Sequence, residues 1–222
     1  MMIREKIKNI VYLHPYYLIA ILLSGLIFSC SSDIDNGYLS EEFRLDFSTV
    51  KLSNNKLSLL TDNNYTISDS TLSRVSFTKK NGQRVIANYT PLANGNNTIH
   101  SVTDILTSKT IKGRFDTLYT APVKIQSIWT GGGYINLILT FNRYSKTHSF
   151  GLYYKNSATD TLQLSHNDMG DSQGYPVRTY MSFLIDGLKI NSTGDSIPIH
   201  IKVPDSNGFG YYTINIPASS DN

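Results

Sequence analysis

Alternation of apolar and polar residues is the feature that most constrains the fold of this chain. The clearest case runs from Ile135 to Phe141, where every second residue is Ile, Leu or Phe and the residues between include one apolar residue, Ile138, which suggests cover on both faces near the middle. Successive side chains of a β-strand point to opposite faces, so this pattern places one apolar face against a core. No stretch after Cys30 has sustained helical periodicity. The sequence therefore predicts an all-β fold.

The second half of the chain carries roughly seven alternating segments separated by turn signals. They lie at residues 123–129, 135–141, 148–154, 162–164, 177–185, 197–203 and 212–216. Short, regularly spaced strands of this kind predict an antiparallel, immunoglobulin-like β-sandwich, which we assign to residues 113–218, with a tail at 219–222. Pro198 lies within one segment and predicts an edge or a bulge there, because proline has no backbone N–H to donate.

The first half is expected to form a smaller domain over residues 42–112. Short strands are predicted at 43–47, 57–59, 75–78, 85–89 and 99–106, with Phe43, Leu45 and Phe47 alternating on the half-buried first strand. Asn81-Gly82 lies between two of these strands and predicts a type I′ hairpin turn, because both residues accept a positive φ. A small barrel suits a lone domain of this size, since it closes its own edges.

The segment before Cys30 has the layout of an export signal. A short basic stretch comes first, and the apolar run Tyr16–Phe28 follows it. This layout predicts a signal peptide over residues 1–29 that is removed by cleavage. Cys30 lies directly after the predicted cleavage point and resembles the lipobox of bacterial lipoproteins, in which this cysteine is acylated and becomes the new N-terminus.

Acylated Cys30 would attach the chain to a membrane, with residues 30–41 as a polar tether. Several acyl chains, palmitate among them, hold a protein firmly, at about 0.8 kcal/mol per buried methylene. We therefore predict an extracytoplasmic lipoprotein of the outer membrane, facing the periplasm or the cell surface. The alternatives are an uncleaved membrane anchor, which needs about 20 apolar residues, and an ordinary buried thiol.

The charge balance argues against nucleic acid as a partner. The whole chain has 20 basic and 17 acidic residues, and the predicted signal peptide holds three of the former and one of the latter. The remainder is almost neutral, so it lacks the basic surplus that binds phosphate backbones. Because Cys30 is the only cysteine, no disulfide can form and both domains depend on their cores.

Four short segments resemble the NigD-like lipoproteins. The first domain holds residues 82–85 (GQRV) and 88–92 (NYTPL), and the second holds 128–137 (IWTGGGYINL) and 166–171 (HNDMGD). The resemblance extends from about Phe43 to Ile216. It implies an OB-type barrel followed by a β-sandwich, lipoprotein character and an association with bacteriocin loci. It implies no reaction, ligand or catalytic residue.

A ligand surface, if present, is expected to draw on the last two of these segments, namely on Trp129, Tyr134, His166, Asn167 and Asp171. Trp129 could stack on a ligand if it is exposed. The more frequent role of a large aromatic residue in a sandwich is to anchor the core, and we expect that role here.

The remaining motifs have plain structural explanations. Residues 167–171 predict a tight turn, with a calcium site as the alternative, because Asn, Asp and Gly suit both. Gly131-Gly132-Gly133 predicts a tight turn or bulge and not a phosphate loop, because a strand follows it. The histidines after Cys30 lie on separate predicted strands, and no nucleophile–base set or carboxylate pair is evident. We therefore expect no metal, no cofactor and no enzymatic activity.

These observations predict a lipid-anchored protein of the cell envelope with a binding or interaction role. Its partners would be the membrane, through the lipid, and an unidentified envelope protein, peptide or glycan. Two alternatives stay open. One is an immunity-type accessory protein associated with bacteriocins, which rests on the family resemblance alone. The other is a hydrolase that degrades an envelope or other polymer.

Overall fold

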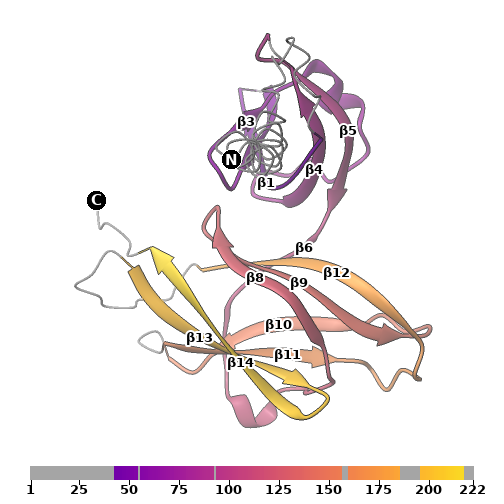
Figure 1. The fold of residues 1–222 in the computed structure, drawn as a ribbon, viewed down its shortest axis with the longest axis vertical. Coiled ribbons are helices and arrows are strands. Elements are labelled where there is room, and N and C mark those ends of the chain that lie inside the picture. The colour runs from indigo at the N-terminus through magenta and orange to yellow at the C-terminus, as the bar shows by residue number, and fades with distance from the viewer. Residues whose placement is uncertain (1–42, 55, 93, 157–159, 186–195, 218–222) are drawn as a thin grey trace, which may run out of the picture. The chain divides into compact units, whose positions relative to one another are not determined.

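The computed structural model describes residues 43–54, 56–92, 94–156, 160–185 and 196–217 (Figure 1). Within them it has fourteen strands in three sheets, and its helical elements are the short 3₁₀ turns η1 (Ser70–Arg74) and η2 (Phe115–Thr117). The all-β prediction is confirmed. The predicted signal peptide, Cys30 and the tether lie outside the described residues. No helix in the described ranges is long and apolar enough to cross a bilayer.

The first sheet has the strand order β3-β2-β1-β4-β5 (Figure 1). Its strands are β1 (Arg44–Ser53), β2 (Lys56–Thr61), β3 (Thr66–Ile67), β4 (Arg84–Pro91) and β5 (Asn97–Asp104). All its pairings are antiparallel. Its core includes Val50, Leu59, Val85, Ala87 and Val102. No ladder joins β3 to β5 among the described residues, so closure into an OB-like barrel stays a prediction.

The prediction of a half-buried face at Phe43, Leu45 and Phe47 is correct only for Phe47, which is half-buried. The side chains of Phe43 and Leu45 are 71% and 64% exposed. Side chains alternate along β1, and the core face of this strand carries Val50, which is fully buried. Alternation located the strand correctly but did not identify which of its two faces meets the core.

The segment at residues 75–78 is not a strand, contrary to prediction. Its apolar side chains pack against the first core without joining a ladder. Thr78 donates its backbone N–H and its hydroxyl to the Asp104 carboxylate, at 2.9 and 2.7 Å. The turn that follows is not of type I′, because Gly82 has a positive φ of 83° while Asn81 does not. Side-chain hydrogen bonds therefore replace the predicted hairpin.

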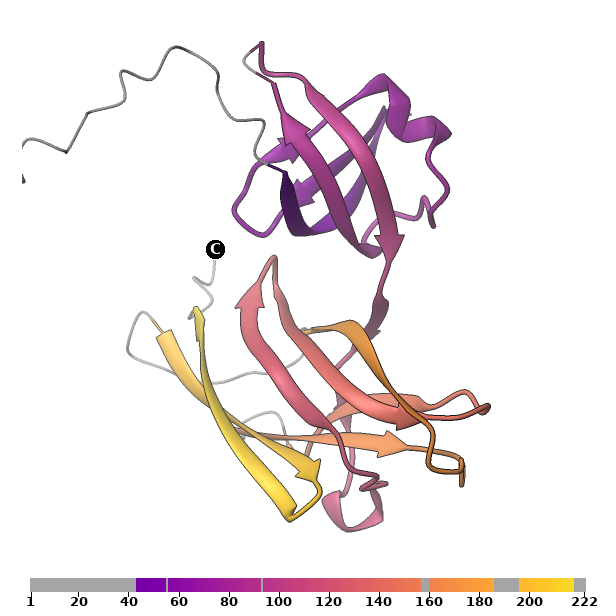
Figure 2. The same cartoon turned by 45° about the vertical axis from the view of Figure 1, so that its right-hand side comes forward.

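The second half is a β-sandwich with sheets ordered β14-β13-β11-β10-β7 and β6-β12-β9-β8 (Figure 2). Its strands are β6 (Leu106–Lys109), β7 (Ile111–Lys112), β8 (Lys124–Gly131), β9 (Tyr134–Arg143), β10 (Ser149–Tyr154), β11 (Thr161–Asn167), β12 (Tyr175–Leu184), β13 (Ser196–Asp205) and β14 (Gly208–Pro217). The long strands β8 to β14 correspond to the alternating segments of the sequence, so the sandwich prediction is confirmed.

The expectation of a purely antiparallel sandwich is wrong. Strand β6 pairs with β12, β7 with β10 and β11 with β13 in parallel. Because β6 and β7 precede residue 113, the predicted domain boundary falls after two strands of the sandwich. Pro198 lies on β13, which is interior and not at an edge. The β11 ladder reaches only residues 200–202 of β13, so the missing N–H of Pro198 breaks no bond on that side.

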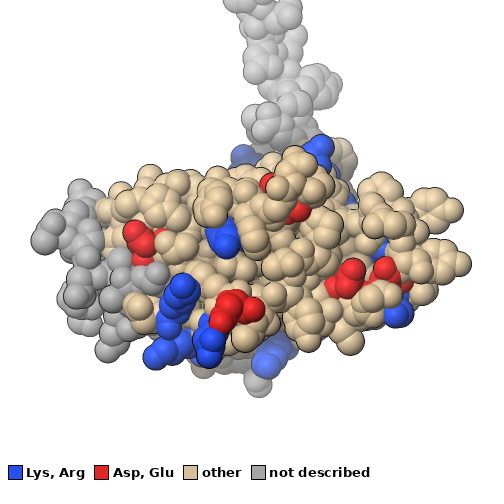
Figure 3. Space-filling view, turned by 90° about the horizontal axis from the view of Figure 1, so that it is seen from below, with Lys and Arg blue, Asp and Glu red and all other residues tan. Residues whose placement is uncertain are grey.

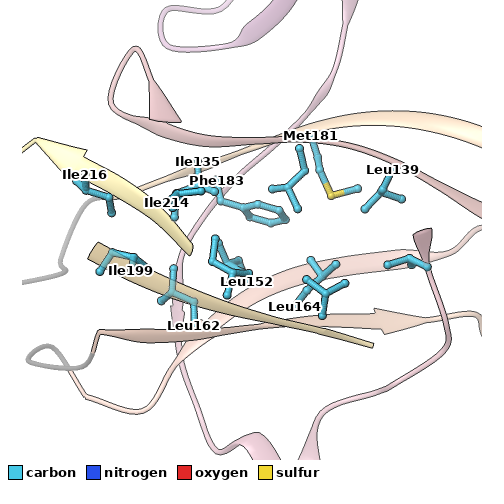
Figure 4. Close-up of a cluster of buried hydrophobic side chains, with 14 of the residues drawn as sticks. Ile135, Leu139, Leu152, Leu162, Leu164, Met181, Phe183, Ile199, Ile214 and Ile216 are labelled. Carbon is cyan, nitrogen blue, oxygen red and sulfur yellow. The ribbon is translucent and has the colours of Figure 1, made fainter. Parts of the chain in front are cut away.

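The sandwich core lies between the two sheets (Figure 4). Leu139 and Phe183 from one sheet meet Leu152 and Leu164 from the other, and all four side chains are fully buried. Burial of each contributes about 1.5–3 kcal/mol. Since the described residues hold no cysteine, burial of this kind is the main source of their stability.

Candidate functional site

The structure separates the residues predicted to form a ligand surface into two groups. Trp129 and Tyr134 flank the β8–β9 turn. His166 lies near the other end of β9, where its ring centroid is 5.1 Å from that of Phe141. The strand between Tyr134 and Phe141 spans about 23 Å. The two groups therefore cannot contact one small ligand together.

The β8–β9 turn consists of Gly132 and Gly133, with φ angles of 60° and 84°. Positive φ at both central residues is the geometry of a type I′ hairpin, so the tight-turn prediction is confirmed. A Cβ atom on Gly132 would lie 2.5 Å from Oδ1 of Asp62 in the first half of the chain. Glycine is therefore required here for the turn and for this close approach.

A fully buried arginine, Arg84, lies beside this turn and connects the two halves. It donates from Nη2 to Oδ2 of Asp62 at 2.8 Å and to Oδ1 of Asn136 at 3.1 Å. Its Nη1 donates to Thr49 Oγ1 at 2.9 Å, and its Nε donates to Ser182 Oγ at 3.4 Å. Asp62 Oδ1 adds an ion pair at 2.7 Å, without a well-aligned hydrogen bond. Every N–H-bearing nitrogen of the guanidinium thus has a partner, as a buried cation requires.

Aromatic rings complete the surroundings of Arg84. Its guanidinium carbon lies 4.8 Å from the ring centroid of Tyr134, whose hydroxyl donates to the Gly82 carbonyl at 3.1 Å. Trp129 meets Phe47 edge to face at 4.8 Å and is half-buried. The prediction that Trp129 anchors the sandwich core is wrong, because it packs on the first sheet instead. The Trp129–Tyr134 group is an internal junction.

The second group contains a buried chain of hydrogen bonds that the sequence did not predict. Nε2 of His148 lies 3.2 Å from Oδ2 of Asp171, and its Nδ1 lies 2.8 Å from Nε2 of His166. Nδ1 of His166 lies 3.0 Å from the carbonyl oxygen of Ala121. The side chains of His148 and Asp171 are each 2% exposed. We call this chain the histidine relay.

The strand register explains why His148 and His166 meet. β10 and β11 are antiparallel neighbours, and Phe150 pairs with His166. His148 precedes Phe150 by two residues, so it is a diagonal neighbour of His166, within reach across such a pair. Pairing the two predicted strands through their connecting loop would have indicated this contact. A search for closely spaced histidines along the sequence could not.

The ionisation of this group follows from its surroundings. Burial lowers the pKa of His166, because it disfavours the charged ring, and the nearby His148 adds to the effect. Desolvation acts to raise the pKa of Asp171. The N–H groups of Tyr144 and Ser145 and the bond to His148 outweigh that effect and hold the pKa well below its usual range. Asp171 is therefore a carboxylate and His166 is neutral near pH 7.

Asp171 also ties together the loops that follow β9 and β11. Its carboxylate accepts the N–H groups of Tyr144 at 2.8 Å and Ser172 at 3.0 Å. Lys146 Nζ donates to the carbonyl oxygens of Met169 and Gly170, at 2.9 Å each. Two loops distant in sequence are thus held by charged groups on both sides, which reduces their freedom to move.

The loop at residues 167–171 is built from Asx turns. Asn167 Oδ1 accepts the N–H of Met169 at 2.8 Å, and Asp168 Oδ1 accepts that of Gly170 at 3.0 Å. These bonds account for the turn predicted here, since such side chains mimic a backbone turn. Among the described residues no group of three or more His, Cys, Asp or Glu side chains is placed to hold a metal ion.

Three large exposed residues lie on these two loops or directly after them, at the start of β12. Tyr144 is 68% exposed, Met169 is 55% exposed and Tyr175 is 79% exposed. Tyr175 pairs with Arg143, the neighbour of Tyr144. Met169 has a φ of 57°, which costs a non-glycine residue of the order of 1–2 kcal/mol. We call these three residues the loop surface, and it is the candidate binding site.

Comparison with known proteins identifies the family. Residues 107–216 match the NigD-like C-terminal β-sandwich domain. The chain is a NigD-like protein. The resemblance inferred from the four sequence segments is thus confirmed. A search of curated proteins finds no match.

Crystal structures of similar proteins cover most of this NigD-like chain. A NigD-like immunity protein from Bacteroides caccae ATCC 43185 is 26% identical, with a TM-score of 0.64, over 82% of this chain and 100% of that one. A provisionally named toxin-related protein from Parabacteroides distasonis ATCC 8503 is 22% identical, with a TM-score of 0.70, over 79% and 94%. A provisionally named lipoprotein from Bacteroides fragilis NCTC 9343 is 11% identical, with a TM-score of 0.55, over 82% and 100%. The last two comparisons show the fold alone.

In this NigD-like protein the segments that carry the resemblance supply both polar networks. Arg84 and Asn136 belong to the junction between the two halves. His166 and Asp171 belong to the histidine relay. Both networks are buried and hydrogen-bonded within the chain, so these four residues stabilise the fold. The residues of the loop surface, Met169 of the last segment among them, are exposed and so available to a partner.

Proposed function

We propose that this NigD-like protein is an exported lipoprotein, attached to the cell envelope through acylated Cys30, that binds a partner protein without catalysis. The observation that carries the proposal is the loop surface, with Tyr144 and Met169 exposed on braced loops and Tyr175 exposed at the start of β12. Tyrosine and methionine are enriched in protein interfaces, because they supply large contact areas. Bracing reduces the entropy lost on binding.

The charge distribution supports a protein partner over nucleic acid. On the face drawn in Figure 3, Lys and Arg side chains lie among Asp and Glu side chains, and most of the surface is uncharged. Nucleic-acid binding needs a basic stripe or patch. A mixed surface with an exposed aromatic group is suited to a protein interface.

The histidine relay supports a non-catalytic role. All four ring nitrogens of His148 and His166 face a partner within the chain. A general base needs a nitrogen within hydrogen-bond reach of the substrate. The relay offers none, because its groups are buried and already paired.

Lipid attachment is tested by replacing Cys30. The Cys30→Ala chain is expected to leave the membrane fraction and to move from the detergent-rich to the aqueous phase on Triton X-114 separation. The reason is that removal of the thiol removes the acyl chains, which are the expected source of membrane affinity. Ser29→Ala serves as the control and is expected to stay with the membrane. Persistence of Cys30→Ala in the membrane fraction would contradict lipid attachment.

The loop surface is tested by photo-crosslinking in cells that produce the full chain. A photoreactive residue in place of Tyr144 or Tyr175 is expected to give a covalent adduct of one defined mass. Met169→Asp should abolish that adduct, because it places a charge in the proposed apolar contact. Tyr211, which is 71% exposed on β14, is the control position. Equal labelling at Tyr211 would exclude a specific loop-surface contact.

A second candidate is an immunity role, supported by the 26% identity to the NigD-like immunity protein. The partner at the loop surface would then be a toxin secreted by a competing cell. Deletion of the chain is expected to increase sensitivity to at least one toxin producer, and the Met169→Asp chain should fail to restore resistance. Unchanged sensitivity across a panel of producers would exclude this role.

A further inference from the structure

The histidine relay ends on acceptors at both sides, and this limits where its hydrogens can be. At one end is the carboxylate of Asp171, which accepts backbone N–H groups from Tyr144, Ser145 and Ser172 and so is held ionised. At the other end is the carbonyl of Ala121, which has no hydrogen to donate. Every hydrogen in the relay must therefore come from the two imidazole rings.

The hydrogens can be counted from the contacts. Three contacts lie in series: Asp171 to His148, His148 to His166, and His166 to Ala121, at 3.2, 2.8 and 3.0 Å. Each needs one hydrogen, since two lone pairs at these distances would repel. Two neutral imidazole rings carry one N–H each. They can fill only two of the three contacts, so the relay is one hydrogen short unless one ring is protonated.

We propose that the folded protein binds one structural proton in this relay, as a singly protonated pair of His148 and His166. The charge lies on the His148 ring, which faces the Asp171 carboxylate. His166 remains the neutral member. It donates from Nδ1 to Ala121 and accepts at Nε2 from His148. The proton thereby completes a hydrogen-bonded connection from the loop after β11 to the segment before β8.

Other charged groups around the pair are consistent with a single positive charge there. Asp168 favours a positive charge at His166, whereas His148 opposes a second one. Lys146 is bonded to the carbonyls of the β11–β12 loop, and Arg143 donates from Nε to the Lys146 carbonyl. Phe141 and Phe150 supply the remaining contacts of the rings and are uncharged. The Asp171 carboxylate is therefore the group that balances the trapped proton.

Because the folded pair holds one proton, the free energy of unfolding should pass through a maximum as the pH is varied. Two unfolded histidines, with an ordinary pKa near 6.5, bind almost no proton at pH 8 and almost two at pH 5. The folded pair binds one in both cases. Stability therefore falls as pH rises above about 7, because the folded state holds more protons, and falls as pH drops below about 6, because the unfolded state holds more. At its steepest the folded-to-unfolded ratio changes tenfold per pH unit on each side.

The experiment is a measurement of proton exchange on unfolding of the full chain in urea, with a pH-indicator dye in weak buffer. At pH 8 unfolding is expected to release about one proton, and at pH 5 to take up about one from the pair. His148→Gln should abolish the release at pH 8, because the extra hydrogen has no imidazole to bind. His200→Gln is the matched control and should leave the release unchanged. His200 is exposed and bonds to Thr213 Oγ1 at 2.9 Å.

A second measurement keeps the inference testable if His148→Gln does not fold. Nitrogen-15 spectra of histidine-labelled full chain at pH 7.5 should show the His148 ring with both nitrogens protonated and the His166 ring neutral and protonated at Nδ1. The proposal would be overturned if the His148 and His166 rings were both neutral. It would also be overturned if the unaltered chain released no proton on unfolding at pH 8. The inference concerns the relay alone and does not depend on the identity of the partner at the loop surface.

Discussion

Arg84→Ala is expected to lower the free energy of unfolding by about 3–5 kcal/mol, the usual effect of breaking a buried ion pair by removing one member. The substitution leaves the Asp62 carboxylate, which is 14% exposed, without its cation. It also leaves Asn136 Oδ1 without one of its donors. Urea unfolding followed by Trp129 fluorescence measures the effect, because this single tryptophan lies at the same junction.

Two further variants show that the lost charge pair causes the effect. Arg74→Ala removes an exposed arginine of η1 and should change stability by less than about 0.5 kcal/mol. Arg84→Met combined with Asp62→Asn leaves no unpaired charge, so it should be less destabilising than Arg84→Ala. A loss below about 1 kcal/mol for Arg84→Ala would show that the junction is open to water and that Arg84 does not connect the two halves.

Phe183→Ala is expected to lower the free energy of unfolding by about 3–5 kcal/mol, through lost apolar burial and the cavity left behind. Phe183 is fully buried on β12 and packs in the sandwich core (Figure 4). Because the described residues have no disulfide to compensate, the loss should appear in full. Thermal and urea unfolding both measure it.

Tyr175→Ala is the matched control, since it removes an aromatic ring from the same strand. Tyr175 is 79% exposed, so its removal should change stability by less than about 0.5 kcal/mol. Loss of partner binding with unchanged stability would be expected for a residue of the loop surface. Equal destabilisation by Phe183→Ala and Tyr175→Ala would show that Phe183 is not part of the sandwich core.

The sequence predicted the long strands of the sandwich well because each carries apolar residues at alternate positions that enter the core. The alternation from Ile135 to Phe141 and the turn at Gly132 were both recognised correctly. The first half was predicted less well. Residues 75–78 have strand-like alternation, but hydrogen bonds from Thr78 to Asp104 hold them outside the sheet. Alternation indicates that side chains on one side of a segment are buried. It does not indicate which groups form hydrogen bonds with the backbone of that segment.

The candidate site was predicted only in part. His166 and Asp171 were selected from the sequence, whereas their partner His148 was judged to be separate. The loop surface was not predicted, because an exposed Tyr144 or Met169 has no periodic signal. Trp129 was misplaced for a related reason: its burial depends on Phe47, which is distant in sequence. Contacts between distant segments depend on register and packing, and neither is encoded in local pattern.

The sequence by itself determined the all-β class, the positions of the long sandwich strands and the NigD-like character, because alternation, turn residues and local motifs act over a few neighbouring positions. Tertiary structure alone decided the parallel pairings, the burial of Arg84 between the two halves and the meeting of His148 with His166. Each of these brings together groups that are far apart in sequence. The stability of these contacts depends on desolvation and hydrogen bonding where the distant segments meet, and they meet only in the folded chain.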